Sequence, residues 1–318
     1  MKEIGGYFEL DKYMLPMLHD GCIMLNSGRN CLAYIIRKRK IHTLHVPKFL
    51  CSAVDGVCRR ENVRVKYYSI DKCFMPESIV CGENEWIYIV NYYGQLDNGT
   101  IKKLKQKYSR IIVDNVQAYF QKPIDGIDTI YTCRKFFGVP DGAFLATDLE
   151  EDDKLADDES FEKMKFILGR FERTASEFYN EYAKREEVFE QEDVKHMSKL
   201  TSNLLHGINY DFVKNRRSEN YEFLHSKLEC LNELNVSIIK GAYMYPLYVE
   251  NGSSVRKILQ QDKIYISTLW PDVFELCSQD ELEYRMAENI LPIPVDQRYT
   301  EKDMNYIVNK IFDAIKCL

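Results

Sequence analysis

Short apolar runs alternate with amphipathic segments through the first half of the chain. Helical spacing between some of these runs predicts helices at residues 30–40 and 52–61. Strands separated by helices predict a mainly parallel sheet with helices on both faces, an α/β architecture. The six runs that we interpret as strands, rich in β-branched and aromatic residues, are 41–46, 63–68, 86–92, 110–113, 128–131 and 143–146.

The pattern changes near Asp148. The acidic segment 148–160 has few bulky apolar residues, and we interpret it as a solvated loop. Residues 161–194 then show helical spacing, which predicts a long helix or a helix pair that bridges to a second domain. We therefore expect a large domain at residues 1–160, followed by a bridging helix and a smaller C-terminal domain at residues 161–318.

The C-terminal part mixes helices with short strands. Two apolar runs, residues 237–249 and 263–268, are predicted to contain strands. A closing helix is expected over residues 300–315, with Thr300 as its N-cap and Asp303 three residues later.

Composition excludes several kinds of partner. The net charge of −6 provides no basic face for nucleic acid or an anionic membrane surface. No apolar run is long enough to cross a bilayer, and the N-terminal segment lacks the apolar core of a signal peptide. The ten cysteines form no CxxC pair and the six histidines are scattered, so we expect no metal site and reduced thiols. These features predict a cytoplasmic protein.

An acidic residue follows the strand predicted at 110–113. Asp114 comes at its carboxyl end, and Gln117 follows three residues later. Ligands bind beyond the carboxyl ends of strands in open α/β sheets, so Asp114 is a candidate ligand-binding residue. Taken alone, the same position also fits a helix cap.

The next predicted strand is followed by a hydroxyl group and an amine. Thr132 precedes Lys135 by three positions, a spacing that would place the hydroxyl near a phosphate and the amine over a ring. The loop at 136–143 contains two glycines, which permit close approach of backbone to a ligand. Taken alone, Lys135 is equally compatible with an ordinary surface lysine.

A small-residue turn opens the first predicted helix. It comprises Ser27, Gly28, Arg29 and Asn30, directly after the apolar run 22–25. The free backbone amides at the start of a helix bind anions, although a simple capped helix would look the same.

Together, the three segments fit one cofactor, pyridoxal 5'-phosphate (PLP). PLP needs a lysine that traps its aldehyde, an anionic partner for its pyridine nitrogen and a cup for its phosphate. The carboxylate keeps the ring nitrogen protonated. The lysine first holds the cofactor as a Schiff base and then moves a proton on the substrate.

The order of the segments SGRN, IIVDNVQAYF and TCRKFFGVPDGA resembles the DegT/DnrJ/EryC1/StrS family of sugar aminotransferases, which have PLP fold type I. The resemblance extends to GINY at residues 207–210 and to the tail from residue 289, and so covers nearly the whole chain. It implies an aspartate-aminotransferase-like fold, with a large domain built on a mainly parallel central sheet flanked by helices and a smaller C-terminal α+β domain.

The resemblance also implies a role for each candidate residue. Asp114 would pair with the pyridine nitrogen, Gln117 would lie beside the ring hydroxyl, and Lys135 would form the Schiff base. Asn209 would reach the phosphate of the cofactor in a partner subunit, which implies a homodimer with shared active sites. The phosphate cup would be formed by Ser27, Gly28, Arg29, Asn30 and Thr132.

Several positions depart from the family pattern. Arg29 stands where the family usually has threonine, and Asp211 replaces the usual arginine after GINY. Thr132 and Lys135 are three positions apart, whereas the family commonly spaces the corresponding pair by five. The family's GEGG after the lysine is VPDGA here.

The residue that stacks on the ring is not obvious from the motifs. Phe49 and Cys51 are the nearest candidates. Trp270 and Tyr243 could line the acceptor site, although large aromatic residues more often pack in a core.

The resemblance predicts transfer of an amino group to a keto-sugar, linked to a nucleotide, with glutamate as the donor. One alternative is a PLP enzyme for a non-sugar substrate, and another is an inactive relative that binds a ligand or a partner protein. Related sugar dehydratases replace the lysine with histidine, so Lys135 argues against that activity. Retention of Lys135 together with Asp114 favours an active transaminase.

Overall fold

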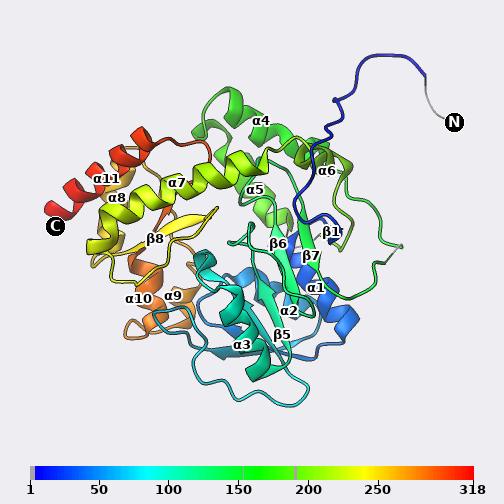
Figure 1. The fold of residues 1–318 in the computed structure, drawn as a ribbon, viewed down its shortest axis with the longest axis horizontal. Coiled ribbons are helices and arrows are strands. Elements are labelled where there is room, and N and C mark those ends of the chain that lie inside the picture. Colours follow the sequence, from blue (N-terminus) through cyan, green and yellow to red (C-terminus); the bar gives the residue numbers. More distant parts are fainter. Residues whose placement is uncertain (1–3, 153, 190–191) are drawn as a thin grey trace.

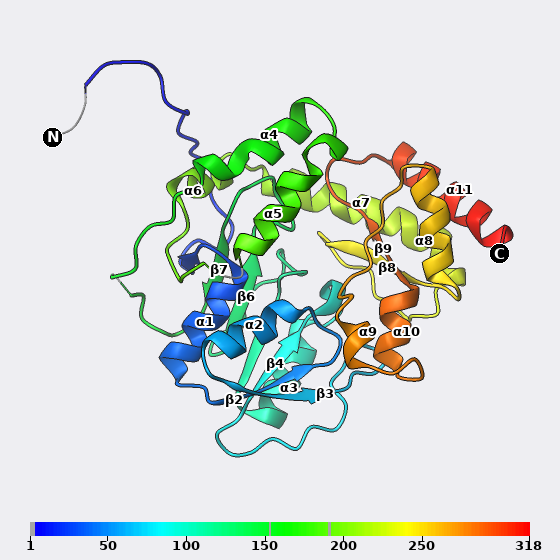
Figure 2. The ribbon, with the colours of Figure 1, turned by 180° about the vertical axis from the view of Figure 1, so that it is seen from behind.

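A seven-stranded sheet lies at the centre of the protein (Figures 1 and 2). The computed structural model describes residues 4–152, 154–189 and 192–318. The six strands predicted from the sequence are confirmed as β2 to β7, and the run at 22–25 contributes β1. The sheet has the order β1-β7-β6-β5-β4-β2-β3, with bounds β1 (Ile23–Leu25), β2 (Thr43–Pro47), β3 (Arg64–Tyr68), β4 (Trp86–Val90), β5 (Ile111–Asp114), β6 (Asp128–Thr132) and β7 (Ala143–Ala146).

Strand direction places the candidate residues at one edge of this sheet. Strands β2 to β6 are parallel to their neighbours within that group. Strand β7 is antiparallel to both β6 and β1, so β1 points in the same direction as the main group. The segments that follow β1, β2, β5 and β6 therefore all leave the sheet at its carboxyl edge, where α/β proteins bind ligands.

Helices of the first half cover both faces of the sheet. Helix α3 lies in front of it in Figure 1, whereas α1 and α2 lie in front in the reverse view of Figure 2. With both faces covered, β5, β6 and β7 are buried along their whole length. The helices predicted at 30–40 and 52–61 are confirmed; the three bounds are α1 (Gly28–Arg39), α2 (Ser52–Arg60) and α3 (Asn98–Tyr108).

The helical region predicted after residue 160 consists of two helices separated by a non-helical break. Helix α4 (Lys165–Glu172) stops at Arg173, whose φ of −135° and ψ of −127° are not helical. Helix α5 (Tyr179–Phe189) follows. A Cβ at Gly169 would lie 2.3 Å from the Phe178 ring, so glycine is needed for the two halves to pack. A short 3₁₀ turn precedes α4 at Phe161–Met164, and another precedes α5 at Ser176–Phe178. Helix α6 (Lys199–Leu205) follows α5.

A small antiparallel sheet forms the centre of the C-terminal part. It consists of β8 (Met244–Tyr248) and β9 (Ile290–Pro294). The closing helix begins after Thr300, whose N–H donates to the Asp303 carboxylate at 2.8 Å, so the predicted N-cap is confirmed. The helices of this part are α7 (Tyr210–Leu228), α8 (Gly252–Gln261), α9 (Val273–Leu276), α10 (Leu282–Asn289) and α11 (Glu301–Lys316).

The prediction of a strand at residues 263–268 is wrong. Ile264 and Ile266 are buried while Tyr265 is 64% exposed, so the alternation of apolar and polar faces that suggested a strand does exist. However, the small sheet consists of β8 and β9, and residues 263–268 form a turn and a loop without strand pairing.

Both parts of the protein share one apolar core. Val113 of β5, Leu247 of β8 and Ile311 of α11 all belong to the same buried cluster. Burial alone does not divide the chain at residue 160, and the domain boundary expected there stays a prediction. Within the described ranges, no helix combines the length and the apolar character that crossing a bilayer requires.

Candidate active site

Four side chains from separate strand-end segments interact electrostatically at the carboxyl edge of the sheet. Burial raises the pKa of the Cys51 thiol, Lys135 and Arg29 lower it, and Asp114 raises it further. Charges shift a pKa in this way only over short distances. Lys135 also lowers the pKa of Asp114, so the two groups, which lie at the end of β5 and just after the adjacent β6, influence each other electrostatically.

Asp114 is a buried carboxylate held at the end of β5. One carboxylate oxygen accepts a hydrogen bond from the Tyr88 hydroxyl at 2.7 Å, and the other accepts from the Val116 N–H at 2.9 Å. Burial raises the pKa of Asp114, while Lys135 and these two hydrogen bonds lower it in part. Among the described residues, no ion pair is formed by Asp114. The site therefore holds a buried acid with capacity for a cationic partner.

Lys135 lies in a tight turn after β6. The Cys133 carbonyl accepts from the N–H groups of Phe136 at 3.0 Å and Phe137 at 2.9 Å, which closes the turn around the lysine. The Lys135 side chain is exposed, and its Nζ lies 5.6 Å from the centre of the Tyr243 ring. Thr132, the last residue of β6, is buried.

Helix α1 begins beside these residues. Ser27 is its N-cap and accepts a hydrogen bond from the Asn30 N–H at 3.2 Å. A Cβ at Gly28 would lie 3.6 Å from Ile130 of β6 and 3.7 Å from Val116, so the helix start packs against the ends of β5 and β6. The first N–H groups of a helix have no partner within the helix and can bind an anion.

Asn30 has a different role from the one expected of it. Its side-chain amide donates to Asn26 at 2.9 Å and to the main-chain carbonyl of Asp193 at 2.8 Å, and its oxygen accepts from Arg60 at 2.8 Å. These contacts explain why Asn30 is fully buried. Asn30 therefore holds residues 192–193 against α1, and this use of both ends of its amide argues against a direct contact with a phosphate.

Gln117 is buried in the turn that follows Asp114. Its side-chain oxygen accepts from the N–H of Tyr93 at 2.7 Å. Tyr93 has a φ of 53°, a strained left-handed conformation for a side chain of this size. The contact fixes the turn that carries Asp114, whereas a contact of Gln117 with a ring hydroxyl stays a prediction.

The structure distinguishes the two candidates for a ring-facing residue. Phe49 is buried in the core, with its ring centre 4.6 Å from that of Trp270 and 5.4 Å from that of Tyr92. Cys51 is half-buried and lies among the charged groups of the site. Cys51 is therefore the better candidate, and Trp270 packs in the core.

We expect bound PLP to protect Cys51 from alkylation. Only the thiolate reacts, and the raised pKa of Cys51 predicts slow labelling by iodoacetamide near neutral pH, with the rate rising in alkali. Peptide mass spectrometry of the protein labelled with and without PLP measures the effect. The exposed thiols of Cys73, Cys230 and Cys317 serve as controls that PLP leaves unchanged. Equal labelling of Cys51 in both samples would contradict its placement against the ring.

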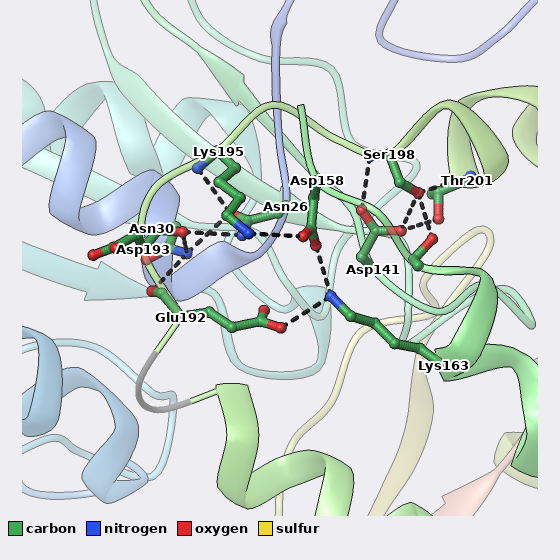
Figure 3. A network of polar contacts seen from close by, with 11 residues as sticks. Asn26, Asn30, Asp141, Asp158, Lys163, Glu192, Asp193, Lys195, Ser198 and Thr201 are labelled. Carbon is green, nitrogen blue, oxygen red and sulfur yellow. Dashed lines mark hydrogen bonds and ion pairs between the residues drawn. The ribbon is translucent and has the colours of Figure 1, made fainter. Parts of the chain in front are cut away.

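A buried polar network fastens the loop after the lysine to α6 (Figure 3). Asp141, fully buried, accepts from the Ser198 N–H at 2.9 Å, from the Ser198 hydroxyl at 2.7 Å and from the Thr201 hydroxyl. At Gly142, which has a φ of 104°, a Cβ would lie 2.8 Å from Thr201. The VPDGA sequence, which departs from the family pattern, thus supplies the carboxylate that holds Ser198, the N-cap of α6, and the glycine that lets Thr201 approach the loop.

The same network joins residues 192–198 to β1 (Figure 3). Asn26 donates to the Asp193 carbonyl at 3.1 Å, and His196 bridges Leu25 as an extra antiparallel contact at the sheet edge. Asp158 accepts from Lys163 at 2.8 Å. The loop that carries Lys135 is thereby tied to the segment that leads to Asn209.

Replacing Asp141 by alanine is expected to lower the free energy of unfolding by about 3 kcal/mol, because it leaves buried donors of Ser198 and Thr201 without acceptors. Thermal or urea unfolding measures the loss. Asp157→Ala is a matched control on a neighbouring segment: Asp157 and Lys199 form an exposed ion pair at 3.7 Å, worth about 0.5 kcal/mol or less. Equal stability of the two variants would contradict the role of Asp141.

Asn209 is exposed and caps helix α7. Its side-chain oxygen accepts from the Phe212 N–H at 3.0 Å. Asp211, which replaces the family's arginine, lies in the first turn of α7. A negative charge there stabilises the helix by its interaction with the helix dipole. Contact of Asn209 with a partner subunit stays a prediction.

Two clusters in the described part of the chain combine potential metal ligands. They are His45, Cys81 and Glu85, and Cys277, Glu281 and Glu283. In each cluster a lysine already pairs with a carboxylate, namely Lys66 with Glu85 and Lys48 with Glu281. We assign both clusters to ion pairing.

The comparisons with known proteins identify the fold. No protein-family model matches the sequence, and no curated protein matches it either. Solved structures do match. A sugar aminotransferase from Micromonospora echinospora is 15% identical, with a TM-score of 0.62 over 91% of this chain and 86% of the other. NtdA from Bacillus subtilis, with the cofactor PMP bound, is 15% identical, with a TM-score of 0.66 over 92% and 73%.

A third structure carries the family name that the motifs suggest. A DegT/DnrJ/EryC1/StrS aminotransferase from Brucella abortus is 13% identical, with a TM-score of 0.61 over 92% of this chain and 85% of that one. At such low identity the comparisons show the fold. The chain has the α/β fold of these aminotransferases, which confirms the fold class predicted from the sequence.

Proposed function

We propose that this protein with an aminotransferase fold is a PLP-dependent transaminase that aminates a keto-sugar linked to a nucleotide, with glutamate as the donor. The observation that supports the proposal is that Asp114 and Lys135 lie at the end of β5 and just after the adjacent parallel strand β6, and influence each other and the Cys51 thiol electrostatically. A buried acid and an exposed amine at the carboxyl edge of the sheet are the two groups that PLP needs from a protein.

Asp114 fits the pyridine nitrogen. Each of its oxygens accepts one hydrogen bond, from Tyr88 or Val116, and a carboxylate oxygen can accept a second. A protonated ring nitrogen would supply the positive charge that favours ionisation of this buried acid. When bound, PLP withdraws electrons from the substrate carbon that carries the nitrogen.

Lys135 supplies the nucleophile and the base. As an exposed amine on a closed turn, it can attach to the cofactor aldehyde, be displaced by the incoming amino group and then move a proton at the substrate carbon. The nearby ring of Tyr243 restricts the directions that its side chain can take.

The start of α1 fits the phosphate. Ser27 caps the helix and Gly28 packs its start against Val116 and Ile130, and Arg29 adds a positive charge that lowers the pKa of Cys51. An arginine there is compatible with an anion, which supports a role for Arg29 at the phosphate.

The sugar substrate is supported by the names of the structural neighbours, which include sugar aminotransferases. The exposed Asn209 at the start of α7 supports a homodimer in which this residue reaches the partner's cofactor. Light scattering in solution tests the dimer. We place the protein in the cytoplasm, as its composition and ten free thiols favour.

Reaction with glutamate tests the function. The purified protein is loaded with PLP, its visible spectrum is recorded, and glutamate is added without an acceptor. We expect the lysine-bound band to convert to the spectrum of the amine form, with one equivalent of 2-oxoglutarate released per site. A nucleotide-linked keto-sugar should then restore the original band. A spectrum that glutamate and other amino acids leave unchanged would instead favour an inactive relative that only binds a ligand.

A further inference from the structure

A fully buried arginine lies behind the turn that carries Lys135. Arg217 on α7 is only 1% exposed, and it is among the largest fully buried side chains of the described residues. Long charged side chains are rarely buried unless paired, so its position requires an explanation.

Arg217 uses its guanidinium to join three segments. One terminal nitrogen donates to the Phe136 carbonyl at 3.2 Å, and the other donates to the Ala242 carbonyl at 3.0 Å and the Tyr243 carbonyl at 3.3 Å. Its Nε donates to the side-chain oxygen of Gln297 at 2.8 Å. Phe136 directly follows Lys135 in the chain, and the ring of Tyr243 faces the Lys135 amine.

Gln297 completes a closed set of contacts. Its amide nitrogen donates to the same Phe136 carbonyl at 2.8 Å while its oxygen accepts from Arg217. The Arg217 guanidinium also lies 4.5 Å from the centre of the Phe136 ring. The backbone directly after Lys135 is thus held by two donors and a stacked cation.

This arrangement costs stability. Burial lowers the pKa of Arg217 to about 10, with Asp296 opposing the shift, so the group stays charged at neutral pH. Within the described part of the chain, no carboxylate forms an ion pair with it. A buried charge that bonds only to carbonyls and an amide is costlier than an apolar residue of similar volume.

The contacts of Arg217 require the planar guanidinium group, whose three nitrogens donate in different directions. A lysine ammonium would keep the charge but could not reach Phe136, Ala242 and Gln297 together from one point. An arginine retained for packing alone would need no such geometry.

We propose that Arg217, together with Gln297, is a positioning residue that holds Lys135 and Tyr243 in the orientation needed to engage the cofactor. The inference rests on the proposed function and adds to it a role for residues that no motif of the sequence indicates. Neither residue needs to touch the cofactor, since both act through the backbone beside the lysine.

Three substitutions test the proposal. Arg217→Lys removes the planar guanidinium and keeps the charge, and Gln297→Met, at a partly exposed position, removes the donor to Phe136 and the acceptor for the Nε of Arg217. Arg256→Lys is the control, because Arg256 on α8 is partly buried and, like Arg217, donates to main-chain carbonyls, those of Glu288 at 3.3 Å and Ile290 at 2.9 Å, which lie outside the Lys135 turn.

The readouts are the dissociation constant for PLP, the pH dependence of the visible band of lysine-bound PLP, and the unfolding temperature of the cofactor-free protein. We expect Arg217→Lys and Arg256→Lys to lower the unfolding temperature similarly. Only Arg217→Lys and Gln297→Met should weaken PLP binding, by about tenfold, and shift the pH midpoint of the band, because displacement of a reacting group by an ångström costs up to about 10²-fold.

Wild-type PLP affinity and an unshifted band in both Arg217→Lys and Gln297→Met would overturn the proposal, as would an equal loss of affinity in Arg256→Lys. If Arg217→Lys does not fold, Gln297→Met decides alone. Absence of a lysine-bound band in the wild-type protein would instead refute the proposed function, so the two failures are distinguishable.

Discussion

Replacing Lys135 by alanine is expected to abolish the visible band of lysine-bound PLP and to lower transamination by about 10³-fold or more. The expected loss is large because one amine performs two tasks, attachment of the cofactor and proton transfer at the substrate carbon. Assay of 2-oxoglutarate release together with the absorption spectrum measures both tasks. Noncovalent binding of PLP should persist, since Asp114 and the start of α1 do not depend on the lysine.

A surface lysine provides the control for this substitution. Lys103 on α3 is exposed, and Lys103→Ala should retain full activity and the band. Turnover of Lys135→Ala within tenfold of the wild-type rate would contradict a catalytic role for Lys135.

Replacing Asp114 by asparagine should lower turnover by about 10²–10³-fold, because a neutral amide no longer stabilises positive charge on the ring nitrogen. The variant keeps the shape of the side chain, so the loss is expected in turnover more than in the fold. Steady-state rates measured at saturating PLP and glutamate test it.

The stability of the same variant should change in the opposite direction. Burial raises the pKa of Asp114 above its value in the unfolded chain, so its ionisation opposes folding at neutral pH. Cofactor-free Asp114→Asn should therefore unfold at a temperature equal to or above that of the wild type at neutral pH. Because the penalty disappears as pH falls through the folded-state pKa, the difference between the two proteins should shrink in acid.

Asp128 provides a matched contrast. It is also a buried strand carboxylate, but it begins β6 at the opposite edge and accepts from Arg39 at 2.9 and 3.0 Å. Asp128→Asn should lose about 2 kcal/mol of stability and keep its turnover. If Asp114→Asn and Asp128→Asn behaved alike in both assays, the assignment of Asp114 to the ring nitrogen would fail.

Local pattern was sufficient to predict most of the large sheet. Strands β2 to β7 carry dense runs of β-branched and aromatic residues, and their order along the chain implied parallel pairing. Strand β9 gave a weaker signal because Pro292 and Pro294 interrupt it; proline is tolerated there since β9 pairs on one side only, with β8.

The candidate site was predictable where its residues follow strands directly. Asp114 ends β5 and Lys135 follows β6 by three residues, so adjacency of the strands allows Lys135 to lower the pKa of Asp114. The supporting contacts were not predictable from pattern, because they join distant positions. Arg217 contacts the Phe136 carbonyl across 81 residues. Similarly, the helix-start pattern at Asn30 could not reveal that its amide holds residues 192–193.

The central claim is that the amine of Lys135 bonds the cofactor. Reduction of the PLP-loaded protein with borohydride, followed by digestion and peptide mass spectrometry, tests it most directly. The account predicts a pyridoxyl phosphate group on the peptide that contains Lys135, at close to one per chain. A label on a different lysine, or no label at saturating PLP, would contradict the account.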